Sequence, residues 1–264
     1  MYRGAWRVLA RWSLAVVALT PASRLLAQRN YYMPVDPITE KIPYDGHFAF
    51  VRLKYTVAEG GYYYRGLPAW AHGYEHAEEN LLKIGADISL LHAHQNVTEI
   101  LAIDDPDLFK YPVSYMTEAG YWLINDAEVK ALRKYLTRGG FLILDDTRDG
   151  FSRGNLGWAN IAANFTRIFP GYKFVDLTPA HPIFHSFFDI TSFDGLTQYY
   201  DRGRPVIRAL FQDNDPTKRI VVLVNFNTDI SNFWEYSATG FKPVAESNEA
   251  YKLGFDYLIY ALTH

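Results

Sequence analysis

The feature that most constrains the fold is a helix–turn–strand unit between residues 125 and 146. Asn125 and Glu128 have the spacing of a helix capping box, and the apolar residues that follow recur on one helical face. The helix ends at Gly139-Gly140 and leads directly into the continuous apolar run 141–144. Such a run is typical of a parallel strand covered on both faces. We therefore predict a βαβ crossover and an α/β fold.

The rest of the chain extends this pattern. We predict further strands at 47–56, 98–105, 113–116 and 219–224, and helices at 75–84, 156–169 and 246–262, the first of them ending at Gly85. Residues 28–46, which contain three prolines, are predicted to be an extended lead-in. With no repeat or linker in view, residues 47–264 are predicted to form a single α/β domain.

The first 27 residues have the pattern of a secretory signal peptide. Arg3, Arg7 and Arg11 precede a short apolar run at 12–20, which is too short to span a membrane. Cleavage after Ala27 would remove four of the 26 basic residues and no acid. The remaining 22 basic and 29 acidic residues give the mature chain a net charge of −7. We expect a periplasmic or secreted protein; the alternative is an uncleaved N-terminus that tethers the domain to a membrane.

Composition excludes several classes of function. The chain has no cysteine, which rules out a disulfide scaffold, a zinc–thiolate site and a thiol nucleophile. Its acidic balance argues against nucleic acid as a partner, because phosphate binding needs a basic face. We assign no cofactor and no metal to any residue.

Polar side chains follow several of the predicted strands. Ligands of parallel α/β sheets bind beyond the carboxyl ends of the strands, so these residues are candidates for ligand binding or acid–base chemistry. The alternative is local, because Asp often terminates strands and caps helices. The catalytic candidates of this kind are Asp145 and Asp146, and the ligand-binding candidates are Asp104, Asp105, Glu118, Asn225 and Asp229. Trp234 is added because exposed aromatic rings stack on sugars, although such rings more often pack in a core.

Three histidine pairs invite a chemical interpretation. His181 and His185 flank Pro182 and become catalytic candidates only if the chain turns helical after the proline; otherwise one makes a structural hydrogen bond and the other lies on the surface. The segment from His72 to His76 matches the H-x-x-E-H pattern, but Gly73 lies within it at a predicted helix start, so we reject a zinc protease. His92 and His94 can share one face of a strand, with no third ligand visible.

Several segments together resemble a bacterial, mostly exported family of unknown function with a fold like the class I glutamine amidotransferases. The segments cover residues 48–55, 78–82, 111–116, 132–146, 181–185, 227–235 and 250–264. The resemblance implies a flavodoxin-like three-layer sandwich with a mostly parallel central sheet. The resemblance does not imply glutamine hydrolysis, because Asp145-Asp146 stands where those enzymes have their cysteine. The segment 181–185 also resembles sugar-utilisation proteins of the same superfamily, which implies a carbohydrate ligand.

Two functions remain open from the sequence. The first is an exported, non-catalytic binding or accessory domain with a protein partner in the cell envelope. The second is a hydrolase, or a metal- or carbohydrate-binding enzyme, that uses Asp145-Asp146 with His181 and His185. The second requires His181 to come within hydrogen-bond reach of the aspartates, directly or through one water.

Overall fold

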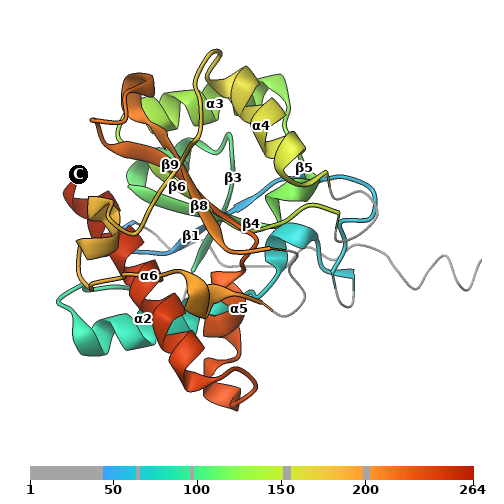
Figure 1. Ribbon diagram of the computed structural model, residues 1–264. Helices are drawn as coiled ribbons and strands as arrows, with labels where there is room; N and C mark the ends of the chain where they lie inside the picture. Colours follow the sequence, from blue (N-terminus) through green and yellow to red (C-terminus); the bar gives the residue numbers. More distant parts are fainter. Residues whose placement is uncertain (1–43, 64–65, 96–97, 151–155, 199–202) are drawn as a thin grey trace, which may run out of the picture.

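A mixed, mostly parallel sheet forms the centre of the molecule. The computed structural model describes residues 44–63, 66–95, 98–150, 156–198 and 203–264, so the predicted signal peptide and most of the lead-in lie outside the described residues. Seven strands lie in the order β3-β1-β4-β6-β9-β8-β7 (Figure 1). They are β1 (Val51–Lys54), β3 (Glu99–Ala102), β4 (Val113–Thr117), β6 (Phe141–Thr147), β7 (Val175–Asp176), β8 (Val206–Phe211) and β9 (Ile220–Phe226). The first five strands of that order are parallel, whereas β8 runs antiparallel to β9 and β7 runs antiparallel to β8.

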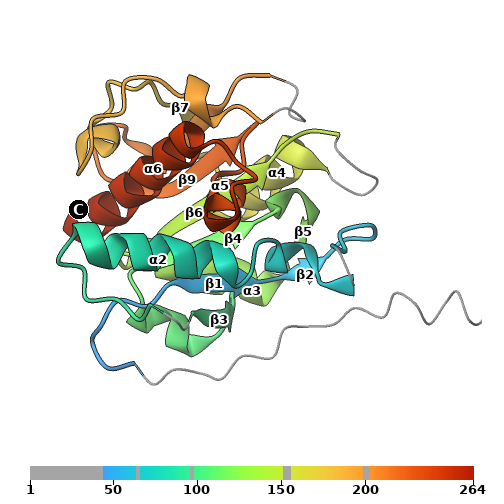
Figure 2. The same ribbon diagram turned by 90° about the horizontal axis from the view of Figure 1, so that it is seen from below.

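Helices cover both faces of the sheet. The helices α2 (His76–Ile88), α5 (Ile230–Glu235) and α6 (Val244–Thr263) lie on one face, and α3 (Asp126–Thr137) and α4 (Gly157–Ile168) lie on the other (Figures 1 and 2). The short strands β2 (Thr56–Val57) and β5 (Trp122–Leu123) form a separate antiparallel pair. The predicted α/β class with a mostly parallel central sheet is confirmed.

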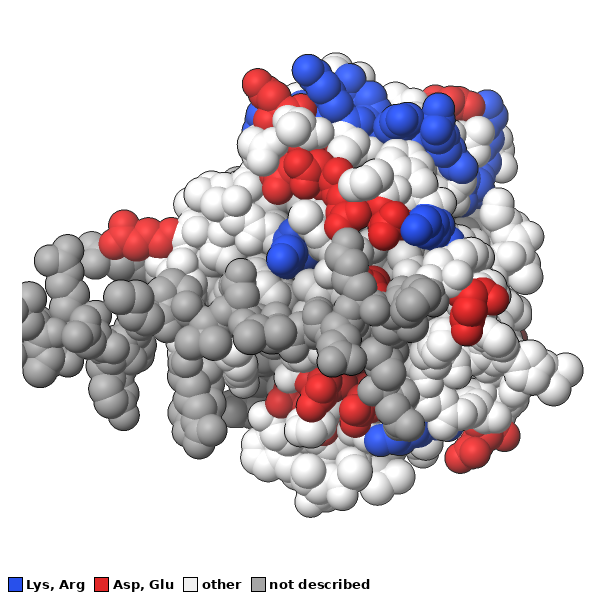
Figure 3. All heavy atoms as spheres, turned by 180° about the vertical axis from the view of Figure 1, so that it is seen from behind, with Lys and Arg blue, Asp and Glu red and all other residues white. Residues whose placement is uncertain are grey.

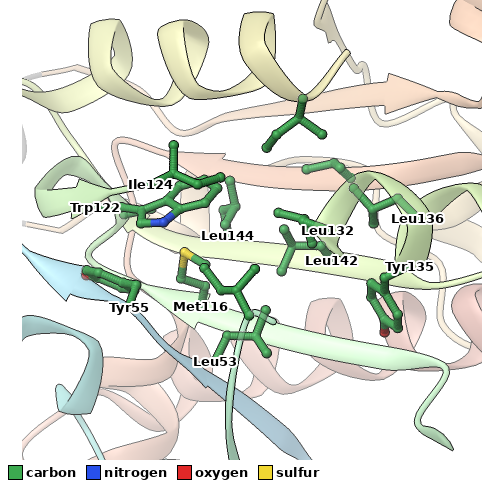
Figure 4. Close-up of a cluster of buried hydrophobic side chains, with 14 of the residues drawn as sticks. Leu53, Tyr55, Met116, Trp122, Ile124, Leu132, Tyr135, Leu136, Leu142 and Leu144 are labelled. Atoms are coloured by element: carbon green, nitrogen blue, oxygen red, sulfur yellow. The ribbon is translucent and has the colours of Figure 1, made fainter. Parts of the chain in front are cut away.

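Strand β6 shows why both faces need a cover. Its side chains alternate, so that Leu142 and Leu144 join the core beneath α3 and α4, while Phe141 and Ile143 join the core beneath α2, α5 and α6. Figure 4 shows the first of these two cores, where Leu142 and Leu144 lie close to Leu132 on α3. The continuous apolar run in the sequence is therefore explained by burial on two sides.

The predicted helix start at Asn125 is confirmed in detail. The Asn125 Oδ1 atom accepts hydrogen bonds from the backbone N–H groups of Ala127 and Glu128, at 2.8 and 3.0 Å. The Glu128 carboxylate returns a bond to the Asn125 N–H at 2.9 Å, which completes the capping box.

The predicted end of the first helix at Gly85 is wrong. Helix α2 continues to Ile88 with Gly85 inside it. A Cβ atom on Gly85 would lie 2.6 Å from the buried ring of Phe255 on α6. The glycine therefore permits close contact between two helices and does not terminate one.

Strands β7 and β8 and helix α5 were not predicted. Strand β7 has two residues and α5 has six, lengths at which hydrophobic periodicity carries little information. Strand β8 has Arg208 in its middle, where the guanidinium lies over the rings of Trp158 and Phe226.

Charge is unevenly distributed on the surface. The exposed side chains of α3 include Lys130, Arg133 and Lys134, and the exposed Arg138 follows directly after the helix. Figure 3, a view from behind, shows Lys and Arg gathered toward the top of the molecule, the end at which α3 lies in Figure 1. Among the described residues, no helix combines the length and apolar character needed to cross a bilayer.

A histidine–carboxylate cluster at the carboxyl edge

Five ionisable side chains, from the end of β6 and from the segments that follow β1, β4 and β9, meet at the carboxyl edge of the parallel strands. His72 lies in the connection after β1, Glu118 follows β4, Asp146 lies near the end of β6, and Asp229 follows β9. Glu235, at the end of α5, lies close enough to His72 for their charges to interact. Because parallel strands all end at the same edge, residues far apart in sequence become neighbours there. We call His72, Glu118, Asp146, Asp229 and Glu235 the carboxyl-edge cluster.

Three members of the cluster approach one another with the spacing of metal ligands. The Nδ1 atom of His72 lies 2.9 Å from Oδ2 of Asp146 and 3.6 Å from Oε1 of Glu118. One ligand atom from each of the three residues lies within 4.8 Å of those of the other two. Ligand atoms bound at about 2.1 Å to one metal are roughly 3.0 to 3.4 Å apart, so the observed spacing needs little adjustment to hold an ion. The other carboxylate oxygen of Asp146 pairs with Arg148.

The backbone is strained where the cluster is built. Glu118, Asp146 and Asn227 all have positive φ angles, of 53°, 52° and 57°. Asp146 also lies in a bulge, since Asp145 and Asp146 together span the gap in the ladder opposite Asn225 of β9. Non-glycine residues in this region cost free energy and are concentrated at functional sites.

His72 is held from behind by a buried arginine. Nη1 of Arg52, on β1, donates to the carbonyl oxygens of Trp70 and His72, at 2.8 and 2.9 Å. The same guanidinium pairs with the buried carboxylate of Glu78 on α2. The ion pair fixes the loop that carries His72, and breaking it would leave a buried charge without compensation.

Negative charge dominates the cluster. Burial alone would lower the pKa of His72, but the nearby Glu118 carboxylate and the charges of Asp229 and Glu235 outweigh burial and raise it. Burial raises the pKa of Glu235, and the charge of Asp229 adds to that rise. Within the part of the chain that the structure describes, Glu118 Oε2, Asp229 Oδ2 and Glu235 Oε2 are buried without a hydrogen-bond partner. Buried carboxylate oxygens without partners are costly unless a cation compensates them.

Asp145 has a different role from its neighbour. Its carboxylate accepts hydrogen bonds from the Tyr115 hydroxyl, the Asn225 amide and the backbone N–H of Ser231, at 2.9 to 3.0 Å. Burial, followed by the charge of Asp229, raises its pKa to about 7, although these hydrogen bonds oppose the rise. The side chain therefore ties the start of α5 to the sheet.

Two other candidates lie in the interior. Asn225 donates to Asp145 and accepts from the Tyr257 hydroxyl at 2.9 Å, so its amide serves the same buried network. Trp234 is buried, and a Cβ atom added to Gly254 would lie 2.5 Å from its ring. Its indole packs between helices and presents no face to a ligand.

The structure does not bring His181 and His185 to the aspartates. The His181 ring packs against Phe211 and Tyr260, and the Tyr260 hydroxyl accepts from the N–H of Ile220, the first residue of β9. That is the amino end of the strands, about 13 Å along β6 from Asp145 at 3.3 Å per residue. The chain does turn helical after Pro182, but His181 Nδ1 accepts from the Ile183 N–H and the exposed His185 pairs with Asp189.

The acids after β3 also lie apart from the cluster. Asp105 caps a short helical turn by accepting from the N–H of Asp107 at 2.9 Å, and Asp104 is exposed. Strand β3 is the edge strand beyond β1, so both residues lie outside the row of β1, β4, β6 and β9.

Comparison with known proteins identifies the family. A family described as a domain of unknown function (DUF4159) matches residues 49–262. The chain belongs to this family. No curated protein matches it. The matched region begins just before β1 and ends within α6, so it contains the carboxyl-edge cluster entirely.

Part of the cluster is predictable from the sequence. Asp146, Glu118 and Asp229 are candidates because they follow strands, whereas His72 stands out only in the H-x-x-E-H motif, which we reject. His76, the second histidine of that motif, is exposed at the first turn of α2, so the motif does not form a paired metal site. No sequence pattern marks Glu235 or Arg148 as a site residue, because only the tertiary fold brings them to the carboxyl-edge cluster.

Proposed function

We propose that this protein is a divalent-cation-binding domain, with His72, Glu118 and Asp146 as the ligands. The observation that supports it best is the convergence of one imidazole nitrogen and two carboxylate oxygens within 4.8 Å. An oxygen-rich set with one imidazole suits Mn²⁺ or Zn²⁺. An added positive charge would also offset the unpartnered carboxylate oxygens around the set.

The position of the cluster in the fold supports a binding role. The five parallel strands, counted in chain order, lie as 2-1-3-4-5, which is the flavodoxin-like order. Strand β3 lies on one side of β1, and the later parallel strands lie on the other side, so the strand order reverses between β1 and β4. Ligands of such sheets bind at this point of reversal. We therefore propose that the fold is amidotransferase-like, of the flavodoxin-like class, and that it binds its ligand at the carboxyl edge where the strand order reverses.

Burial favours a cation over a sugar as the primary ligand. His72 and Asp146 are buried, and Trp234, the aromatic residue selected for sugar stacking, lies inside the core. A buried polar set of this size matches a single ion, whereas a carbohydrate needs an open aromatic platform.

A general-base role for His72 is the second candidate function. It is favoured by the 2.9 Å contact between His72 Nδ1 and Asp146 Oδ2, the arrangement by which a carboxylate orients a catalytic imidazole. In that case the imidazole would activate a water in a hydrolytic reaction, with no covalent intermediate.

Mn²⁺ titration of the full chain, followed by electron paramagnetic resonance, tests the cation proposal. We expect one bound Mn²⁺ in the wild type, and a tenfold or greater loss of affinity in His72→Ala and Glu118→Gln. His76→Ala is the matched control, because His76 belongs to the same sequence motif and is exposed. Wild-type affinity in His72→Ala would contradict the proposal. Hydrolysis that survives removal of metal by a chelator and is abolished in His72→Ala would establish the general-base role instead.

We propose further that the domain is exported and acts as an accessory subunit in the cell envelope. The basic and short apolar segments at the N-terminus support export. Affinity capture from the native envelope, with wild type and His72→Ala compared, tests this role. A partner bound in a stoichiometric amount by the wild type is expected, and its absence from the wild-type sample would contradict the role.

A further inference from the structure

A second group of ligand-type side chains lies at the opposite, amino edge of the sheet. His47 Nδ1 lies 3.0 Å from Oδ2 of Asp45, and His94 Nε2 lies 3.1 Å from Oδ1 of the same carboxylate. One ligand atom from each of the three residues lies within 4.8 Å of those of the other two. We call Asp45, His47 and His94 the amino-edge cluster.

The backbone holds the two histidines on the same face. Phe48 and Ala93 form an isolated parallel bridge, with hydrogen bonds from the Phe48 N–H to the His92 carbonyl and from the His94 N–H to the Phe48 carbonyl, at 3.2 and 2.9 Å. Phe48 and Ala93 pack against the core. Side chains alternate along extended chains, so His47 and His94 point away from the core, and His92 lies on their side of the bridge.

We propose that Asp45, His47 and His94 form a zinc site. Two imidazoles with one carboxylate are a common Zn²⁺ ligand set, and three protein ligands leave a fourth position for water or another donor. Ligand atoms at about 2.1 Å from zinc are roughly 3.4 Å apart in tetrahedral geometry, which is close to the spacing observed.

The carboxylate is prepared for this role. The backbone N–H of His47 donates to Asp45 Oδ1 at 2.9 Å, which fixes the turn that presents the side chain. Its two oxygens lie toward the two imidazoles, Oδ2 toward His47 Nδ1 and Oδ1 toward His94 Nε2. The arrangement of the turn therefore presents one carboxylate to both histidines.

A cavity adjoins the amino-edge cluster, and His47 is part of its lining. It has a volume of about 460 Å³ and is lined in part by His47, His92, Tyr44 and Leu262. His92 is exposed and lines the same cavity, and the fourth position on the ion is open to water or another donor. Zinc here would join the segment that enters β1 to the segment that precedes β3, and would stabilise the start of the domain.

Zn²⁺ titration of the full chain by calorimetry, combined with X-ray absorption at the zinc edge, tests the inference. We expect His94→Ala and Asp45→Ala each to lose tenfold or more in affinity at one site. The absorption spectrum of the wild type should show more than one imidazole at about 2.0 Å from zinc. His185→Ala is the matched control, because His185 is an exposed histidine that pairs with one aspartate and belongs to neither group of ligand-type side chains.

The same titration in His72→Ala separates this site from the carboxyl-edge cluster. Retention of a His94-dependent site in that background supports the inference even if the proposed function fails. Equal affinities in wild type and His94→Ala, or a spectrum without multiple imidazoles in His72→Ala, would overturn it. Circular dichroism of each variant verifies the fold, and because all three residues lie on the surface segments 45–47 and 92–94, we expect no change.

Discussion

At the residue scale, one residue type has different roles in different surroundings. Asp145 and Asp146 are adjacent, yet Asp145 accepts hydrogen bonds from the start of α5, whereas Asp146 faces His72 and Arg148. A bulge and a left-handed backbone at Asp146 separate their directions. The two adjacent aspartates therefore have different roles: Asp145 is structural, and Asp146 is a candidate metal ligand.

Asp256 supports a pH-dependence prediction. Its buried carboxylate accepts from the backbone N–H groups of Phe187 and Phe188 at 2.8 Å, and burial raises its pKa to about 6. The folded state therefore binds more protons than the unfolded state between about pH 4 and pH 6. Stability is lost as the pH rises through this range.

We expect Asp256→Asn to reduce that loss. The free energy of unfolding of the wild type should fall between pH 4 and pH 6.5 by up to about 2 kcal/mol more than that of the variant. Urea denaturation at several pH values measures both slopes. Asp104→Asn, at an exposed aspartate, serves as the control, and equal slopes in wild type and Asp256→Asn would contradict the assignment.

At the element scale, close helix contacts depend on glycine. Gly85 on α2 meets the Phe255 ring, and Gly254 on α6 meets the Trp234 ring. In each case a Cβ atom would lie less than 3 Å from an aromatic side chain that is itself buried. The layer of α2, α5 and α6 is therefore set by side-chain volume more than by helix propensity.

We predict that Gly85→Ala destabilises the protein. Alanine favours a helix by about 1 kcal/mol over glycine, but overpacking against Phe255 should cost about 1 to 3 kcal/mol, so the net change is a lower melting temperature. Phe255→Leu in the same chain should restore part of the loss relative to the two single variants. A higher melting temperature for Gly85→Ala would show that propensity outweighs packing here.

At the scale of the whole molecule, the proposed sites lie at opposite edges of one sheet. Strand β1 connects them, since His47 precedes it and His72 lies in the connection that follows it. Parallel strands place all their carboxyl ends together, which concentrates acids at one edge. The amino-edge cluster instead depends on a single bridge between Phe48 and Ala93.

Expression of the whole chain in a bacterial host tests the prediction that the N-terminal segment is a signal peptide. We expect the protein recovered from the periplasm to begin at Gln28, as a signal peptide cleaved after Ala27 requires. Ala27→Glu should block cleavage and retain the precursor at the membrane. A wild-type protein that begins at residue 1 or 2 and fractionates with the membrane would establish the tethered alternative.

The sequence by itself determined the α/β class, the capped helix α3 and the apolar strand β6, because periodicity and capping are local properties of the chain. It also marked Glu118, Asp146 and Asp229, because residues that follow parallel strands share an edge. Only the tertiary structure decided that His72 joins them, that His181 lies at the far end of the sheet, and that Asp45 and His47 complete a set with His94. These outcomes depend on distances between segments remote in sequence, which follow from packing and strand register and have no local signal.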